Sequence, residues 1–75
     1  MLTLRRNLNG WEWVIVDDEG HHVFMSRSFY AVPSYMHGND IDAIRVEVEP
    51  GEFLWLEHEM AEGWTEQEAK NIVIA

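Results

Sequence analysis

The chain contains no cysteine, so its 75 residues must be held together without any disulfide bond. A domain of this size buries only about 60% of its unfolded surface, and its core is correspondingly small. Apolar packing must therefore supply the stability that disulfides give to many other small domains. Hydrophobic residues make up 47% of the chain and include four Trp. Because disordered acidic chains lack such side chains, we expect a single acidic globular domain over residues 1–75.

Residues 11–25 have the pattern of a β-hairpin. Residues 11–16 are rich in aromatic and β-branched side chains, and the Asp-Asp-Glu-Gly sequence at 17–20 has turn chemistry. Residues 21–25 then return as the second strand. A short strand over residues 2–5 precedes this hairpin, and it is expected at an edge of the sheet.

A second hairpin is predicted over residues 44–56. Apolar and charged side chains alternate over residues 44–49, which puts one face of this strand in the core and the other in water. Pro-Gly-Glu at 50–52 forms the turn. Residues 53–56 are apolar at every position, as expected of an inner strand that is covered on both faces. The strand aromatics expected in the core are Trp11, Trp13, Phe24, Phe53 and Trp55.

The last ten residues predict a short helix. Thr65 and Glu68 match a capping box, in which each side chain satisfies a backbone donor of the other residue. Residues 26–39 are less regular and are compatible with a helical turn or an ordered aromatic loop, because Pro33 opposes a helix. The expected fold is α+β: a small antiparallel sheet of two hairpins, with four to five strands and a C-terminal helix packed on one face.

The charge of the chain is strongly negative and unevenly distributed. Fourteen Asp and Glu oppose five Lys and Arg, which gives a formal net charge of −9. Ten of these acids lie in residues 40–75, together with only Arg45 and Lys70. Direct binding to nucleic acid or to an anionic membrane is not expected, since both rely on clustered basic side chains. The natural complement is a basic protein.

No motif in the sequence identifies an enzyme, a cofactor site or a metal centre. His58 and Glu62 are spaced for a shared metal on a helix, but the second His of a zincin motif is missing. The acids are numerous enough for acid–base catalysis, yet solvated surface acids have the same appearance in sequence. We therefore expect a protein that is not an enzyme and has no catalytic residue, cofactor or metal ligand.

The sequence also suggests a cytoplasmic protein. The basic residues near the start follow a short apolar stretch, whereas a secretory signal places them before a longer one. No apolar run approaches the roughly 18 residues of a membrane span. The lack of cysteine fits a reducing compartment.

The expected partner-binding surface combines carboxylates with aromatic anchors. Tyr30 and Tyr35 lie in the irregular segment and Trp64 precedes a helix cap, so each either packs on the core or anchors a partner. Glu57 and Glu59 are expected to continue the last strand. The full set of candidate residues is Glu47, Glu49, Glu52, Glu57, Glu59, Glu62, Glu66, Tyr30, Tyr35 and Trp64.

A small, cysteine-free, acidic domain with an aromatic loop is similar in type to phage-encoded inhibitors, among them anti-CRISPR proteins and other DNA mimics. This similarity rests on size and charge and assigns no residue. It implies that the carboxylates imitate phosphates and occupy the basic site of a nucleic-acid-binding protein. Two alternatives stay open. The acids can serve solubility alone, or the chain can be a small assembly domain that forms a homodimer through Trp64 and residues 30–36.

Overall fold

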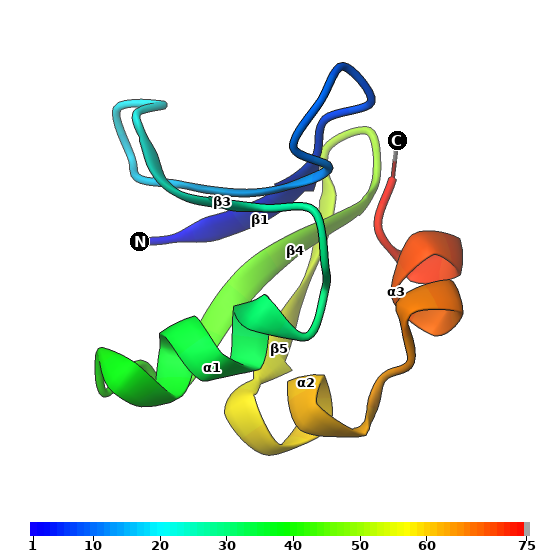
Figure 1. Ribbon diagram of the computed structural model, residues 1–75. Helices are drawn as coiled ribbons and strands as arrows, with labels where there is room; N and C mark the ends of the chain where they lie inside the picture. The colour runs from blue at the N-terminus through cyan, green and yellow to red at the C-terminus, as the bar shows by residue number, and fades with distance from the viewer. Residues whose placement is uncertain (75) are drawn as a thin grey trace.

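The computed structural model describes residues 1–74 as a five-stranded sheet with three helices (Figure 1). The elements in chain order are β1 (Thr3–Arg6), β2 (Trp13–Val16), β3 (His22–Ser26), α1 (Ala31–Gly38), β4 (Ala43–Glu49), β5 (Glu52–Glu57), α2 (His58–Gly63) and α3 (Glu66–Ile72). The α+β class, both hairpins and the C-terminal helix are confirmed.

The strand order is β3-β2-β1-β4-β5, so β1 lies at the centre of the sheet. The edge position expected for this strand is wrong. Within each hairpin the strands are antiparallel, as expected, but β1 and β4 pair in parallel through Thr3 and Arg45. Leu4 of β1 is completely buried. The short strand is therefore central because the second hairpin packs along its free side.

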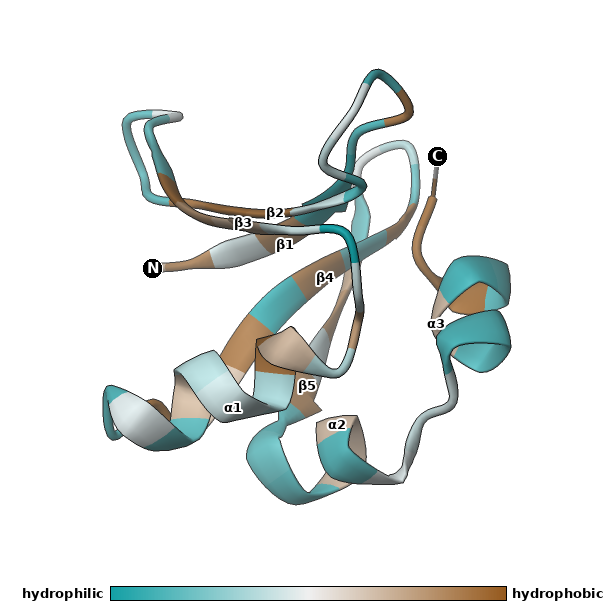
Figure 2. Ribbon diagram, viewed as in Figure 1, coloured by the Kyte–Doolittle hydropathy of each residue, from teal (hydrophilic) through white to brown (hydrophobic). Residues whose placement is uncertain are grey.

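The core lies between one face of the sheet and all three helices. Leu4, Ile15 and Val46 are partners across β1, β2 and β4 and project to this face together. The helices contribute Val32, Met36, Ala61 and Ala69 to the same cluster. Figure 2 shows that apolar residues concentrate on the strands, whereas α2 and α3 are mostly hydrophilic. The helices thus cover one face of the sheet only.

The opposite face of the sheet, which we call the open face, carries no helix. Val16, Thr3, Arg45 and Trp55 are successive partners across β2, β1, β4 and β5 and form one row on it. Phe53 lies on the same face of β5, two residues before Trp55. Alternate side chains of the outer strand are therefore left in contact with solvent.

Three of the five aromatics expected in the core are not there. Trp11, Phe53 and Trp55 have exposed fractions of 49%, 39% and 55%, whereas Trp13 is completely buried and Phe24 is partly buried. Phe53 and Trp55 are exposed because β5 is an edge strand that is covered on one face only. The expectation of an inner strand covered on both faces is wrong for the same reason.

The irregular segment contains a true helix, α1. Pro33 is its third residue, where the backbone N–H has no acceptor within the helix, so the proline ring removes no hydrogen bond. The backbone N–H of Ser28 donates to the hydroxyl of Ser26 at 3.0 Å and fixes the chain just before the helix. Val32 and Met36 are completely buried and attach α1 to the core.

The chain turns into α2 immediately after β5. Glu59 therefore lies on a helix and does not continue the strand, as the sequence had suggested. The next helix, α3, begins with the predicted capping box. The backbone N–H of Glu68 donates to the Thr65 hydroxyl and the backbone N–H of Thr65 donates to the Glu68 carboxylate, each at 3.1 Å.

Candidate functional site

Six of the seven candidate carboxylates surround the β4–β5 hairpin and α2, and the seventh, Glu66, lies on α3. Glu47, Glu49 and Glu52 lie at the turn of the hairpin. The other three lie at the opposite end of β5 and on α2: Glu57, Glu59 and Glu62. From Glu52 to Glu57 the strand extends about 17 Å, at roughly 3.4 Å per residue. The acids therefore form two groups, one at each end of the outer strand.

Four of these carboxylates are not neutralised by the chain itself. Glu47 lies 3.6 Å from the guanidinium of Arg5, and Glu62 lies 2.7 Å from the imidazole of His58. Within residues 1–74 the remaining four form no ion pair and are exposed; we call them the free carboxylates, Glu49, Glu52, Glu57 and Glu59.

Among residues 1–74, the contacts of the basic side chains are made to groups other than the free carboxylates. Arg6 and Lys70 both contact Glu12, at 2.6 and 3.6 Å. Arg45 lies over the ring of Phe53, with its guanidinium carbon 4.1 Å from the ring centre. The hairpin and α2 consequently keep an excess of negative charge, which attracts a basic surface.

Glu66 has a different role from the other candidate acids. One carboxylate oxygen accepts from the indole N–H of Trp13 at 2.6 Å, and the other accepts from the backbone N–H of Phe29 at 2.8 Å. Both donors belong to completely buried residues. This carboxylate links α3 to the core, and each of its oxygens accepts a hydrogen bond from within the domain.

Of the three candidate anchors, the structure leaves only Tyr30 largely exposed, at 61%. Tyr35 is partly buried and stacks on Phe24, with ring centres 4.5 Å apart. Trp64 is partly buried and stacks on Phe29 at 5.8 Å. Tyr35 and Trp64 therefore belong to the packing of the domain.

Phe53 and Trp55 are surface residues, contrary to the expectation that they lie in the core. Both project from β5 onto the open face, between the two groups of free carboxylates. Aromatic side chains are enriched at the energetic centres of protein interfaces. Their exposure follows from the edge position of β5, and the uninterrupted apolar run at 53–56 carries no sign of that position.

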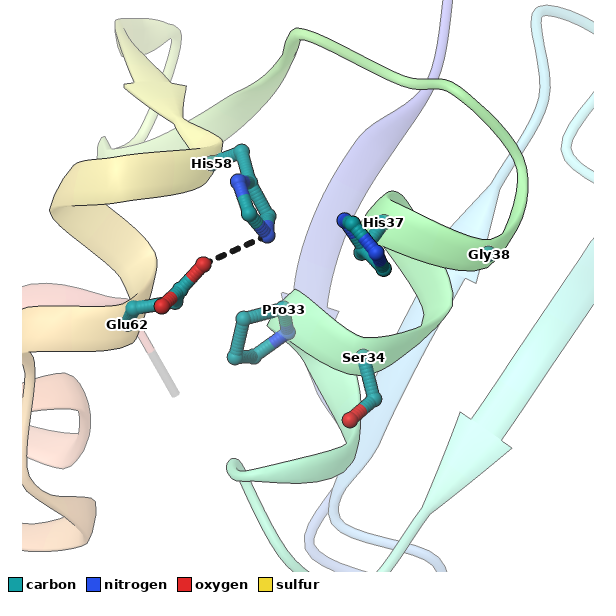
Figure 3. Close-up of a pocket in the computed structure, with 6 residues that line it drawn as sticks. All are labelled: Pro33, Ser34, His37, Gly38, His58 and Glu62. Atoms are coloured by element: carbon teal, nitrogen blue, oxygen red, sulfur yellow. Dashed lines mark ion pairs between the residues drawn. The ribbon is translucent and has the colours of Figure 1, made fainter.

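A shallow hollow of about 390 Å³ lies between α1 and α2 (Figure 3). The imidazole Nε2 of His58 lies 2.7 Å from the Glu62 carboxylate, as their spacing on a helix suggested. The ring of His37 stacks on that of His58, with ring centres 5.4 Å apart and planes inclined by 25°. The remaining lining residues are Pro33, Ser34 and Gly38.

The hollow is poorly arranged for a metal ion or a nucleophile. Because the two imidazole rings are nearly parallel, their nitrogen lone pairs, which lie in the ring planes, do not converge on one point. Among residues 1–74, no three His, Asp or Glu side chains are grouped to hold a metal ion. Figure 3 shows the Ser34 hydroxyl directed away from both rings. The hollow offers an imidazole beside a carboxylate, without a nucleophile next to it (Figure 3).

Comparisons with protein-family models, with curated proteins and with solved structures found no significant match to this chain. Function must therefore be argued from the surface itself. In the part of the chain that the structure describes, no helix is both long enough and apolar enough to cross a bilayer.

Proposed function

We propose that this protein is a non-enzymatic binding protein whose free carboxylates dock on the basic site of a nucleic-acid-binding protein. The observation that carries the proposal is the exposure of Glu49, Glu52, Glu57 and Glu59 without any ion pair among the described residues. The carboxylates take the place of phosphates, as in the small inhibitors that the chain resembles in size and charge. No catalytic step is needed for this function.

The free carboxylates are held on regular structure, which favours binding by a preformed surface. Glu52 and Glu57 lie at the two ends of β5, and Glu59 lies in the first turn of α2. Charges held on a rigid frame lose little conformational freedom when a partner binds. Their common sign speeds the encounter with a basic protein and makes it sensitive to salt.

The test compares two variants that each remove two exposed carboxylates. Glu57→Gln/Glu59→Gln changes the proposed surface, and Asp18→Asn/Glu19→Gln changes the distant β2–β3 turn. The immobilised protein first captures basic proteins from a lysate of the cells that encode it, and the affinity of each captured protein is then measured. We expect about a tenfold loss for the first variant and less than about threefold for the second.

A competition experiment completes this test. We expect the captured protein to release its DNA or RNA when the acidic protein is added, because both compete for one basic site. Simultaneous binding of nucleic acid and this protein would overturn the proposal, and so would equal affinity for the two variants.

A second candidate function is assembly through self-association, which the exposure of Phe53 and Trp55 favours. Of the residues that the sequence suggested for this role, Trp64 and residues 30–36, Trp64 is partly buried and Met36 completely buried, whereas Tyr30 is exposed. The formal charge of −9 on each copy opposes this candidate. Sedimentation at high protein concentration separates the two functions, since a monomer in both low and high salt excludes assembly.

A further inference from the structure

The outer edge of β5 is available for pairing with another chain. β5 is the last strand of the sheet and pairs only with β4, in an unbroken register from Ala43↔Glu57 to Glu47↔Phe53. None of the turn, loop and cap hydrogen bonds of residues 1–74 uses the backbone of Phe53–Leu56. An exposed edge of this kind can accept an extended segment as a further strand.

The other edge strand is less suitable. The register between β2 and β3 shifts at Ile15 and Val16, and such bulges twist an edge away from regular pairing. β3 also contains no acidic residue. A basic segment therefore finds complementary charge at β5 and not at β3.

β5 presents an apolar centre between two negative ends. Phe53 and Trp55 lie two residues apart on the open face, with exposed fractions of 39% and 55%. The exposed carboxylates of Glu52 and Glu57 flank them. A matching segment has apolar side chains at two alternate positions and a Lys or Arg at each end, five residues apart.

The same charges oppose pairing of β5 with a second copy of itself. In a symmetric antiparallel pair of β5 strands, each copy brings Glu52 and Glu57 to the shared edge, and β5 contains no basic side chain to offset them. Such like charges, on two copies that each carry a formal charge of −9, repel each other. The edge thus favours a basic segment over a homodimer.

We propose that β5 binds an extended segment of a basic protein, which adds to the sheet as a sixth, antiparallel strand. The apolar side chains of the segment pack on Phe53 and Trp55, and its terminal Lys or Arg side chains pair with Glu52 and Glu57. This inference rests on the proposed function and specifies how the partner is held.

The probe is a fluorescein-labelled peptide, Lys-Thr-Val-Thr-Ile-Lys, whose binding is followed by fluorescence anisotropy. The peptide with both Lys replaced by Glu is the charge control. Two further peptides are N-methylated, one on Val and Ile and the other on both Thr. Because alternate residues of a strand direct their N–H groups to the same side, only one methylated peptide should lose binding.

We expect the Lys-ended peptide to bind, and the Glu-ended peptide and one methylated peptide to bind at least about tenfold more weakly. The other methylated peptide should stay within about threefold. Trp55→Ala should weaken binding about tenfold, since it removes an exposed aromatic anchor while the buried core is unchanged. Asp18→Asn/Glu19→Gln is the matched control and should bind normally.

The inference is overturned if the Lys-ended peptide does not bind up to about 1 mM, or if the two methylated peptides bind equally well. It is also overturned if the Glu-ended peptide binds as well as the Lys-ended peptide, or if a thymidine oligonucleotide binds more tightly than the Lys-ended peptide. These outcomes are separable from failure of the proposed function. If Glu57→Gln/Glu59→Gln weakens capture of the natural partner but the methylated peptides do not differ, the partner binds the acids by another geometry. If capture is insensitive to those carboxylates, the proposed function itself fails.

Discussion

Glu66 fixes two buried aromatic residues from different parts of the chain. Its two carboxylate oxygens accept from the indole N–H of Trp13 and the backbone N–H of Phe29, whose rings meet edge to face with centres 5.1 Å apart. Each donor would otherwise be buried without an acceptor, which is costly. A single side chain on the C-terminal helix therefore completes the hydrogen bonding of the core.

We expect Glu66→Ala to lower the free energy of unfolding by about 2–4 kcal/mol, because it leaves two buried donors without an acceptor. Glu66→Gln should lose about half as much, since an amide has one acceptor oxygen and its NH₂ group faces a donor. Gln67→Ala, on the exposed side of the same helix, should stay within about 0.5 kcal/mol. Urea unfolding measures all three, and equal stabilities would contradict this role of Glu66.

At the scale of elements, the β2–β3 hairpin is closed by the carboxylate of Asp17. One of its oxygens accepts from the backbone N–H groups of Glu19 and His21, each at 2.9 Å. The hydrogen bond from the His21 N–H is the main cause that holds the pKa of Asp17 below its usual value, and desolvation, the next largest effect, opposes it. The N–H of Glu19 and the nearby imidazole of His21 add to the lowering.

This lowered pKa predicts a pH dependence of the turn. The ionised carboxylate stabilises the folded chain above the pKa that Asp17 has when unfolded, about 3.8, and that stabilisation is lost as the pH falls through the lower folded value. We expect the difference in unfolding free energy between the wild type and Asp17→Asn to shrink from pH 7 to pH 2. A difference that is constant or grows on acidification would refute the role of the charged form.

Local signals predicted some elements and could not predict others. The hairpins and the capping box are encoded by neighbouring residues, such as Thr65 and Glu68, and they were found. The central position of β1 was not predicted, because it depends on β4, whose Arg45 pairs with a residue 42 positions earlier. Pro33 made the sequence argue against a helix at α1. A proline is compatible with the first turn of a helix, but the sequence does not show that α1 begins only two residues earlier. α2 has only six residues, which is too few for a clear hydrophobic period.

The candidate site was likewise predicted only in part from the sequence. Composition predicted the acidic character of the second half, and Glu49, Glu52, Glu57 and Glu59 are indeed exposed. It could not distinguish Glu66, whose internal role depends on contacts with residues 13 and 29. Exposure of the β5 aromatics likewise follows from strand order, which neighbouring residues do not encode.

At the scale of the whole molecule, charge repulsion must lower stability. The formal charge is −9, and no Lys or Arg side chain of residues 1–74 forms an ion pair with a free carboxylate. Repulsion between exposed like charges destabilises a folded protein and is screened by salt. Stability and partner binding should therefore respond to salt in opposite directions.

We expect the free energy of unfolding to rise by about 1 kcal/mol between roughly 20 mM and roughly 300 mM NaCl. Glu57→Gln/Glu59→Gln should show a smaller rise, because two of the repelling charges are gone. Urea titrations at several salt concentrations measure both. A stability that falls with added salt would mean that attractive ion pairs, such as that between Arg6 and Glu12, outweigh the repulsion.

The parallel contact between β1 and β4 has a consequence for synthesis on the ribosome. The strand at the middle of the sheet is made first, yet its second neighbour emerges only after some forty more residues, because Thr3 pairs with Arg45. Until then the nascent chain holds β1 beside β2 with one side uncovered, and local pairing alone cannot complete the core. The sheet can therefore be completed only after β4 and β5 have been made, when both hairpins are available together.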